Sequence, residues 1–378
     1  MVGAARPGRG RPGRVVRGGG AAARRPQAAA APAGRPNPAD DTTFTGPLAR
    51  DLRSHVDLFA KSMPRGAAVA WVYMTVLVAW AEDHALIGPW LRTGAKAARE
   101  EFLAIPAGGM RGWLARAMAS LAVHPGTWSL LDPKWTPLRE GVPPEGACRD
   151  LAGWWDSSAP GLAYDVSDGP GSITGWVPGD LLQHLSDDRR KGNALVQTPW
   201  WVCDLILDKT LVPAAGEFTG EPLRVIDPAC GSGHFLIRAV SYLWEWYTTG
   251  SLAPRQAKSG AVTGGTPLRP GEAVRRIIAG VHGCDKDPLT TAVARLRYTV
   301  AAGDLMRQAG LITGPLRLDR IPPFQVPVIP GDALLAKVDG VSARQYAELH
   351  PQLAAIVNLG TSPEGPRQEA LSGLGEAS

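Results

Sequence analysis

The sequence predicts an α/β domain with a parallel, doubly wound sheet, preceded by an α-helical domain. Two observations carry this prediction. From about residue 191 onward, short runs of β-branched residues alternate with longer stretches in which apolar residues recur every three or four positions, a rhythm typical of strands and the helices that cover them. Between about residues 44 and 190 the helical spacing occurs alone. With 378 residues, 44% of them hydrophobic, the chain is long enough for two domains with cores of their own.

The chain therefore divides into three parts. Residues 1–43 are mainly Ala, Gly, Pro and Arg, and we expect them to be disordered because they cannot bury enough apolar surface to offset the entropy lost on ordering. A low-complexity or mis-assigned start is the favoured interpretation of this tail, ahead of a weak contact to nucleic acid. Residues 44–190 form the predicted helical domain, and residues 191–378 form the predicted α/β domain.

The net charge of +5 comes from the tail rather than from the predicted domains. Residues 1–40 hold eight arginines and one aspartate, so the rest of the chain is close to neutral. The charge therefore does not indicate a nucleic-acid-binding face on the folded part. The four cysteines are scattered, with no CxxC pair, which indicates neither a disulfide framework nor a zinc site and fits a reducing cytoplasm. A cytoplasmic protein is also expected because the N-terminus lacks the apolar segment of a secretory signal.

The helical domain is predicted to contain helices at 48–63, 66–86, 97–105, 110–123 and 179–185. Pro- and Trp-containing loops are expected between Pro125 and the last of these. Residues 66–81 carry no charge, but they fall short of the roughly 20 residues that a membrane span needs. Because Arg65 and Glu82 bound the run, we predict a buried core helix and no membrane partner.

Six tryptophans crowd this domain: Trp113, Trp128, Trp135, Trp154, Trp155 and Trp176. Exposed aromatic rings can stack on nucleic-acid bases. Tryptophan in a helical domain is more often part of the core or of an interface, and that interpretation is favoured here.

The α/β domain is predicted to have about four strands, in the segments 223–228, 281–288, 324–329 and 353–358, with helices at 202–211, 233–247 and 288–305. Residues 248–272 lie between the first strand's helix and the second strand. They are rich in Gly and Pro, which predicts an inserted mobile loop.

The first strand leads directly into the string DPACGSGHFL, residues 227–236, and then into a helix. Such a turn is typical of nucleotide-binding α/β proteins. Gly231 and Gly233 permit positive φ and lack a Cβ, so the backbone can approach a ligand closely. Asp227 ends the strand, where open α/β sheets bind ligands, and its carboxylate suits a cationic ligand better than a pyrophosphate. S-adenosylmethionine, with its ammonium and sulfonium groups, has that chemistry.

DPACGSGHFL resembles motif I of the N6-adenine-specific DNA methyltransferases. The resemblance implies a Rossmann-like, S-adenosylmethionine-dependent methyltransferase sheet as the fold. It also implies that the turn binds S-adenosylmethionine as cofactor through Asp227, Ala229, Gly231, Gly233 and Phe235. A Rossmann-like protein with a different cofactor is the alternative.

Three further segments match in the order of that family's gamma arrangement. QTPWW resembles the segment before motif I and implies that Thr198 and Pro199 close over the methionine end of the cofactor. GCDKDP resembles motif II, whose acidic residue, here Asp285, accepts hydrogen bonds from ribose hydroxyls. GDAL resembles motif III and implies that Asp332, beside Ala333, receives the adenine amino group of the cofactor.

The resemblance covers about residues 190–335, less than half of the chain. Together with the helical domain in front, it is similar to the large methyltransferases of bacteriophage-exclusion, or phage growth limitation, systems. The family's Asn/Asp-Pro-Pro-aromatic motif, which holds an adenine flipped out of the duplex, is missing from this sequence. Residues 321–324 read Ile-Pro-Pro-Phe, but they lack the Asn and precede motif III, so no catalytic role is expected. Asn358 ends the predicted fourth strand; it is a remnant of the catalytic position or, as favoured, a plain loop residue.

The sequence thus predicts an adenine-specific DNA methyltransferase that transfers a methyl group from S-adenosylmethionine to adenine N6, in a restriction-modification or phage-defence system. We expect the chain to be truncated after motif III. Its expected partners are DNA and a complementing methyltransferase or defence-system subunit, and no metal is implied. The alternatives are a non-catalytic S-adenosylmethionine-binding subunit of a defence complex and a methyltransferase acting on RNA or protein. The sequence predicts neither the catalytic residues nor the recognition site.

Overall fold

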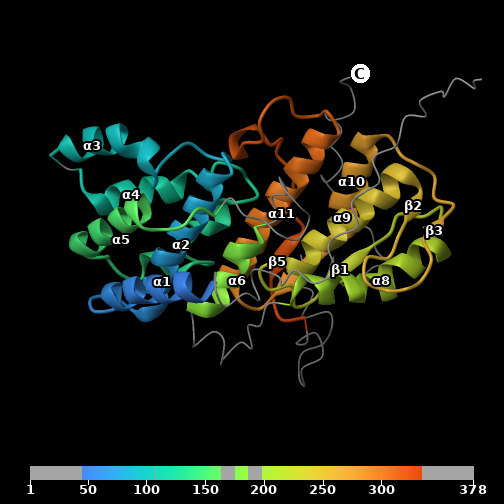
Figure 1. Ribbon diagram of the computed structural model, residues 1–378, viewed down its shortest axis with the longest axis horizontal. Coiled ribbons are helices and arrows are strands. Elements are labelled where there is room, and N and C mark those ends of the chain that lie inside the picture. Colours follow the sequence, from blue (N-terminus) through green and yellow to red (C-terminus); the bar gives the residue numbers. More distant parts are fainter. Residues whose placement is uncertain (1–44, 107, 163–174, 186–197, 334–378) are drawn as a thin grey trace, which may run out of the picture. The chain divides into compact units, whose positions relative to one another are not determined.

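The computed structural model describes residues 45–106, 108–162, 175–185 and 198–333 (Figure 1). All of them belong to one compact unit, Asn37–Ser378. The predicted tail, the predicted fourth strand and Asn358 lie outside the described residues. Within them, one continuous cluster of buried apolar side chains extends from Leu48 in the helical part to Val328 in the sheet.

The helical part has six described helices and short 3-10 turns. The helices are α1 (Thr45–Phe59), α2 (Arg65–Asp83), α3 (Lys96–Ala104), α4 (Met110–Ala119), α5 (Glu145–Ser157) and α6 (Trp176–Leu185). The turns are Thr93–Ala95, Trp128–Leu130 and Pro137–Arg139, and a further one, Leu318–Arg320, lies between α11 (Pro288–Gln308) and β5 (Val328–Pro330). The predicted helices are therefore present, with ends that differ by a few residues. The segment expected to be loops after Pro125 contains α5, which the prediction missed.

Helix α2 forms the centre of this part. Every residue from Ala67 to Ala81 is buried, and α1, α4 and α6 pack against the helix. The uncharged run is thus a core helix, as predicted. None of the helices in the described ranges is long and apolar enough to cross a membrane.

Most of the tryptophans are core residues, as favoured from the sequence. Trp113, Trp155 and Trp176 are buried, and the Trp155 indole donates a hydrogen bond to the Thr75 hydroxyl at 2.8 Å. Trp135 and Trp154 are half-buried and pack against the core, whereas 47% of Trp128 is exposed. All four cysteines are buried and none forms a disulfide.

The sheet in the described residues has three parallel strands in the order β1–β4–β5. They are β1 (Val225–Asp227), β4 (Val281–Asp285) and β5 (Val328–Pro330), and they lie where three of the predicted strands were placed. Asp227 is in register with Gly283, and Asp285 with Pro330. Because the strands are parallel, their carboxyl ends meet at one edge of the sheet.

Four helices accompany these strands: α8 (Trp200–Glu217), α9 (His234–Thr249), α10 (Pro270–Gly280) and α11 (Pro288–Gln308) (Figure 1). Helix α9 packs against α8, α10 and α11, and α11 packs against β4 and β5. The result is a mixed α/β arrangement in which the two predicted strand-to-helix steps, β1 to α9 and β4 to α11, are present.

The prediction of a loop at 248–272 was wrong in part. Helix α9 continues to Thr249, α10 begins at Pro270, and a small antiparallel hairpin of β2 (Ser251–Leu252) and β3 (Val262–Thr263) lies between them. The buried Asp208 carboxylate on α8 holds the segment by accepting hydrogen bonds from the backbone N–H groups of Arg255, Gln256 and Ala257 at 2.9, 2.6 and 2.7 Å. The Tyr242 hydroxyl donates to the same carboxylate at 2.7 Å.

Replacing Asp208 with alanine should release this segment. Burial raises the pKa of Asp208, but these hydrogen bonds outweigh it and lower the pKa below its ordinary value. The stabilisation is therefore present above the unfolded-state pKa of about 4, and it is lost as the pH falls through the lowered pKa. We expect Asp208→Ala to cost about 2–4 kcal/mol of unfolding free energy at pH 7, measured by urea denaturation. Faster hydrogen exchange at residues 255–257 would locate the effect, and unchanged exchange there would contradict it.

Candidate functional site

The turn between β1 and α9 has the backbone geometry that its glycines predicted. The strand ends at Asp227 and the helix begins at His234. Gly231 has φ +53° and Gly233 has φ +90°, a region that residues with a Cβ rarely adopt. A Cβ on Gly233 would also lie 3.3 Å from the Ala294 Cβ on α11. Glycine is thus required both for the conformation and for the close approach of the turn to α11.

Two carboxylates stand on either side of this turn. The Asp227 carboxylate accepts a hydrogen bond from the Ala229 backbone N–H at 3.1 Å. The Asp285 carboxylate, at the end of β4, accepts one from the Gly231 N–H at 2.9 Å and one from the Asp287 N–H at 2.9 Å. The structure therefore brings together the residues assigned from motifs I and II, and it ties the acid of one strand to the glycine turn of the other.

The two carboxylates are held in a setting that disfavours their negative charge. Burial, together with the nearby Asp285 charge, raises the pKa of Asp227 to about 6. Burial and the Asp287 charge likewise raise the pKa of Asp285. A cationic ligand would relieve this repulsion, whereas a pyrophosphate would increase it.

The motif III residues follow the third strand at the same edge. The Gly331 backbone N–H donates to the Asp285 carbonyl oxygen at 2.9 Å, so Asp332 and Ala333 begin beside the end of β4. The Asp332 charge contributes to raising the pKa of the neighbouring Cys284 thiol, after burial and Asp285. All three predicted acids are therefore placed at the carboxyl edge of the sheet.

The remaining predicted residues flank the turn. Pro199 immediately precedes α8, and the Thr198 backbone lies next to the His234 imidazole at the start of α9. Phe235 is half-buried and packs against the apolar core. Thr198 and motif I, which are separate in the sequence, thus meet at the first turn of α9.

The Pro-Pro-Phe string lies away from this edge. The Pro322 carbonyl oxygen is 3.1 Å from the His124 imidazole, and the buried Phe324 ring packs against the same imidazole. These residues join the helical part to the segment that enters β5. This packing role agrees with the expectation that the string is not catalytic.

Sequence reasoning missed one set of contacts at the turn. Helix α6 lies directly against it, with Gly179 facing Ser232 and His234, and Arg297 of α11 reaches the same place. Gly175 lies just before this short helix and Gly179 lies within it. These two glycines were the sequence signal for the contact, because a glycine in a helix often marks a close approach of another segment.

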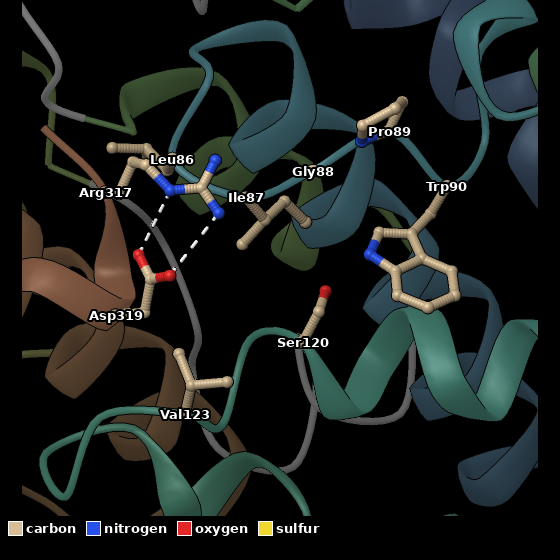
Figure 2. Close-up of a pocket in the computed structure, with 9 residues that line it drawn as sticks. All are labelled: Leu86, Ile87, Gly88, Pro89, Trp90, Ser120, Val123, Arg317 and Asp319. Carbon is tan, nitrogen blue, oxygen red and sulfur yellow. Dashed lines mark hydrogen bonds and ion pairs between the residues drawn. The ribbon is translucent and has the colours of Figure 1, made fainter. Parts of the chain in front are cut away.

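A cavity elsewhere in the molecule contains none of the predicted site residues. It has a volume of about 250 Å³ and lies between the segment after α2 and the segment after α11 (Figure 2). Its lining consists of Leu86, Ile87, Gly88, Pro89, Trp90, Ser120, Val123, Arg317 and Asp319. Arg317 and Asp319 form an ion pair with each other at 3.1 Å, as Figure 2 shows. The described residues also contain no group of His, Cys, Asp and Glu suited to holding a metal ion.

A protein of related sequence aligns with most of the chain. The chain is 34% identical over 290 residues to the adenine-specific methyltransferase PglX of Streptomyces coelicolor. The chain is similar to an adenine-specific methyltransferase. The aligned residues are 71% of this chain but 22% of the relative, so the chain spans about a fifth of that protein's length. No protein-family model and no solved structure matches the chain.

The similarity is to part of a protein that is itself an adenine-specific methyltransferase. It extends beyond the motif-bearing segments, because 290 residues are more than the α/β part contains. The relative and this chain therefore also share sequence in the helical part, where α6 contacts the turn.

Proposed function

We propose that this chain binds S-adenosylmethionine at the turn between β1 and α9, and that it forms the cofactor-binding part of an enzyme that methylates adenine N6 in DNA. S-adenosylmethionine would supply the methyl group as a sulfonium cation. The similarity to methyltransferases of bacteriophage-exclusion systems extends the proposal to a phage-defence or restriction-modification role, with DNA and a complementing subunit as partners.

The observation that carries the proposal is the pair of carboxylates on the glycine turn. Asp227 and Asp285 end adjacent strands, and the Gly231 N–H links the second carboxylate to the turn. In this arrangement Asp227 would attract the cationic methionine end, and Asp285 would accept hydrogen bonds from the ribose hydroxyls. Asp332 would face the adenine amino group, Thr198 and Pro199 would close over the methionine end, and the backbone at Ala229 and Gly231 would approach the ligand.

A non-catalytic, cofactor-binding subunit is the second candidate. It is supported by the packing role of Pro322 and Phe324, because this Pro-Pro-aromatic string contacts His124. The two candidates share the cofactor site and differ only in whether this chain itself binds the target adenine.

Calorimetry on the whole chain tests the shared part. S-adenosylmethionine and its product S-adenosylhomocysteine should each bind at one site. Nicotinamide adenine dinucleotide, whose pyrophosphate would face two carboxylates, should not bind. Binding of the dinucleotide without the methyl donor would support the alternative of a Rossmann-like protein with another cofactor and overturn the proposal.

Transfer of tritiated methyl groups to adenine-containing duplex DNA then separates the two candidates. Incorporation by the chain alone identifies it as the catalytic protein. Incorporation only after addition of a chain that carries the missing Asn-Pro-Pro-aromatic motif assigns it the cofactor-binding part. In either case the label should be found at adenine N6 after digestion to nucleosides.

The affinity for S-adenosylmethionine should rise with pH. Asp227, whose pKa is raised to about 6, must be ionised to attract the cation, and the α-ammonium of the ligand stays mostly charged up to about pH 7. We expect the dissociation constant at pH 5 to be about tenfold larger than at pH 7, as the fraction of ionised carboxylate implies. In Asp227→Asn the dissociation constant should vary less with pH. An equally steep variation in that variant would show that another group causes the pH dependence.

A further inference from the structure

A buried cluster of side chains from three helices encloses the motif I turn. It consists of Trp176 and Gly179 on α6, Ser232 and His234 at the start of α9, and Arg297 on α11. We call it the turn clamp. Trp176, His234 and Arg297 are almost completely buried, with at most 2% of each residue exposed. None of these five residues was assigned a role from the motifs.

Arg297 holds the turn by its backbone. Its guanidinium Nη1 donates a hydrogen bond to the Ser232 carbonyl oxygen at 2.7 Å and another to the Ser232 hydroxyl oxygen at 3.1 Å. Ser232 lies between Gly231 and Gly233, the two residues with positive φ. The two hydrogen bonds therefore hold Ser232 in place between the two glycines that must keep positive φ. Hydrogen bonds from a charged donor are also stronger than those between neutral groups.

Helix α6 closes the clamp from the other side. The Trp176 indole stacks on the His234 imidazole, with ring centroids 3.8 Å apart and planes 7° from parallel. The Arg297 guanidinium lies over the same indole, 5.9 Å from its centroid. Burial, and then the Arg297 charge, lower the pKa of His234 well below its ordinary value. The imidazole is thus neutral at physiological pH and can stack without adding a second buried charge.

Gly179 allows α6 to come this close. A Cβ at this position would lie 2.7 Å from the Arg297 Nη1 atom and 2.7 Å from the His234 Nε2 atom. It would also lie 2.8 Å from the Ser232 Oγ atom. All three distances are shorter than a carbon can tolerate, and all three atoms belong to the clamp. Any larger residue would push the clamp away from the turn.

We propose that Arg297 is a positioning residue for cofactor binding, which acts through Ser232, and that α6 makes the helical part of the chain a component of the cofactor site. This inference rests on the proposed function. A turn that is already held in its binding conformation loses less conformational entropy when a ligand arrives, so pre-organisation raises affinity. The clamp contacts the turn through Ser232 and His234, whereas the two carboxylates contact the backbone at Ala229 and Gly231.

Arg295 offers a matched control for the test. It lies two residues earlier on the same helix and also donates to backbone carbonyl oxygens, those of Gly126, Val326 and Val328, at 3.1, 3.1 and 2.7 Å. These carbonyl groups belong to segments outside the motif I turn. Arg295→Met and Arg297→Met therefore remove the same kind of interaction, and only the second removes it from the turn.

The experiment measures thermal stability and calorimetric affinity for both variants in the whole chain, well below their melting temperatures. Both should melt earlier than the wild type. Only Arg297→Met should weaken binding, by about ten- to hundredfold, the range for loss of hydrogen bonds to a charged group. The loss should be equal for S-adenosylmethionine and S-adenosylhomocysteine, because the turn contacts what the two ligands share. Arg297→Lys, which keeps one charged donor, should recover part of the affinity.

Wild-type affinity in Arg297→Met, or an equal loss in Arg295→Met, would overturn the proposal. If Arg297→Met does not fold, Gly179→Ala is tested instead. Gly153→Ala on α5 is its control, because a Cβ at that position meets no atom within 4 Å. Gly179→Ala should weaken binding and Gly153→Ala should not. The wild type is measured first. If the wild type does not bind S-adenosylmethionine, the proposed function is refuted. If the wild type binds and the variants do not show the expected losses of affinity, only the role of the turn clamp is refuted.

Discussion

Replacing Asp227 with alanine should weaken the binding of S-adenosylmethionine by about a hundredfold or more, the usual effect of removing one partner of a desolvated charge pair. Asp227 ends β1 beside the glycine turn, and its half-buried carboxylate accepts a hydrogen bond from the Ala229 N–H. Asp227 is the one ionisable residue of the described strand β1, Val225–Asp227. Calorimetry at pH 7.5 measures the loss, and unchanged affinity would refute the assignment of motif I as the cofactor site.

Removing the Asp227 charge should weaken ligand binding but increase the stability of the folded chain. The pKa of Asp227 is raised to about 6 in the folded chain, so between pH 4 and 6 the folded state binds more protons than the unfolded state. This group's contribution to stability therefore falls as the pH rises through that window. Asp227→Asn can keep the hydrogen bond from Ala229 and removes the charge. We expect it to raise the unfolding free energy at pH 7 by about 1–3 kcal/mol while weakening cofactor binding. A variant that is less stable and binds normally would contradict both expectations.

Replacing Gly233 with alanine should destabilise the folded chain by about 1–3 kcal/mol, because a residue with a Cβ is strained at positive φ. The new Cβ would also press on Ala294 of α11, and any shift of the turn that relieves this contact would disturb the cofactor site. We therefore expect affinity for S-adenosylmethionine to fall together with stability.

Gly153→Ala is the matched control for this prediction. Gly153 lies within α5 and a Cβ there meets no atom within 4 Å, so the same substitution should stabilise the chain slightly, by about 0.5–1 kcal/mol. Urea denaturation of both variants measures the difference. Equal effects of the two substitutions would contradict the requirement for glycine in the turn.

The residues of the turn could be predicted from the sequence because their geometry is local. Gly231 and Gly233 take positive φ within one short turn. Asp227 and Asp285 meet because each ends a strand of a parallel sheet, which follows from the order of strands and helices. The positions of β1, β4 and β5 could be predicted for the same reason, since each is a short apolar run next to a helical one.

Contacts between distant segments could not be predicted in this way. The 248–272 segment contains Gly and Pro and was expected to be a loop, but the Asp208 carboxylate, far away on α8, organises its backbone. Helix α5 was missed because its tryptophans and glycines obscure the helical spacing, although Trp155 fixes it to α2 through Thr75. The turn clamp depends on α6, α9 and α11 together, so no single segment carries a signal for it.

The relative to which the chain is similar is a much longer methyltransferase, and this bears on how the proposed cofactor site should be studied. The chain spans about a fifth of that relative, and the string that binds the target adenine in the resembled family does not occur in this sequence. The contacts of Gly179 and Arg297 indicate that the helical part should be kept in any study of cofactor binding. A fragment that begins at the sheet would lack one side of the turn clamp.

Hydrogen–deuterium exchange of the whole chain, with and without S-adenosylmethionine, tests the central claim most directly because it locates the ligand on the backbone. The ligand should slow exchange at the amides of residues 229–235, at those of 285–287 and at Asp332 and Ala333, and it should leave the cavity at residues 86–90 unchanged. Protection confined to that cavity, or no protection at the turn when the ligand is saturating, would contradict a cofactor site between β1 and α9.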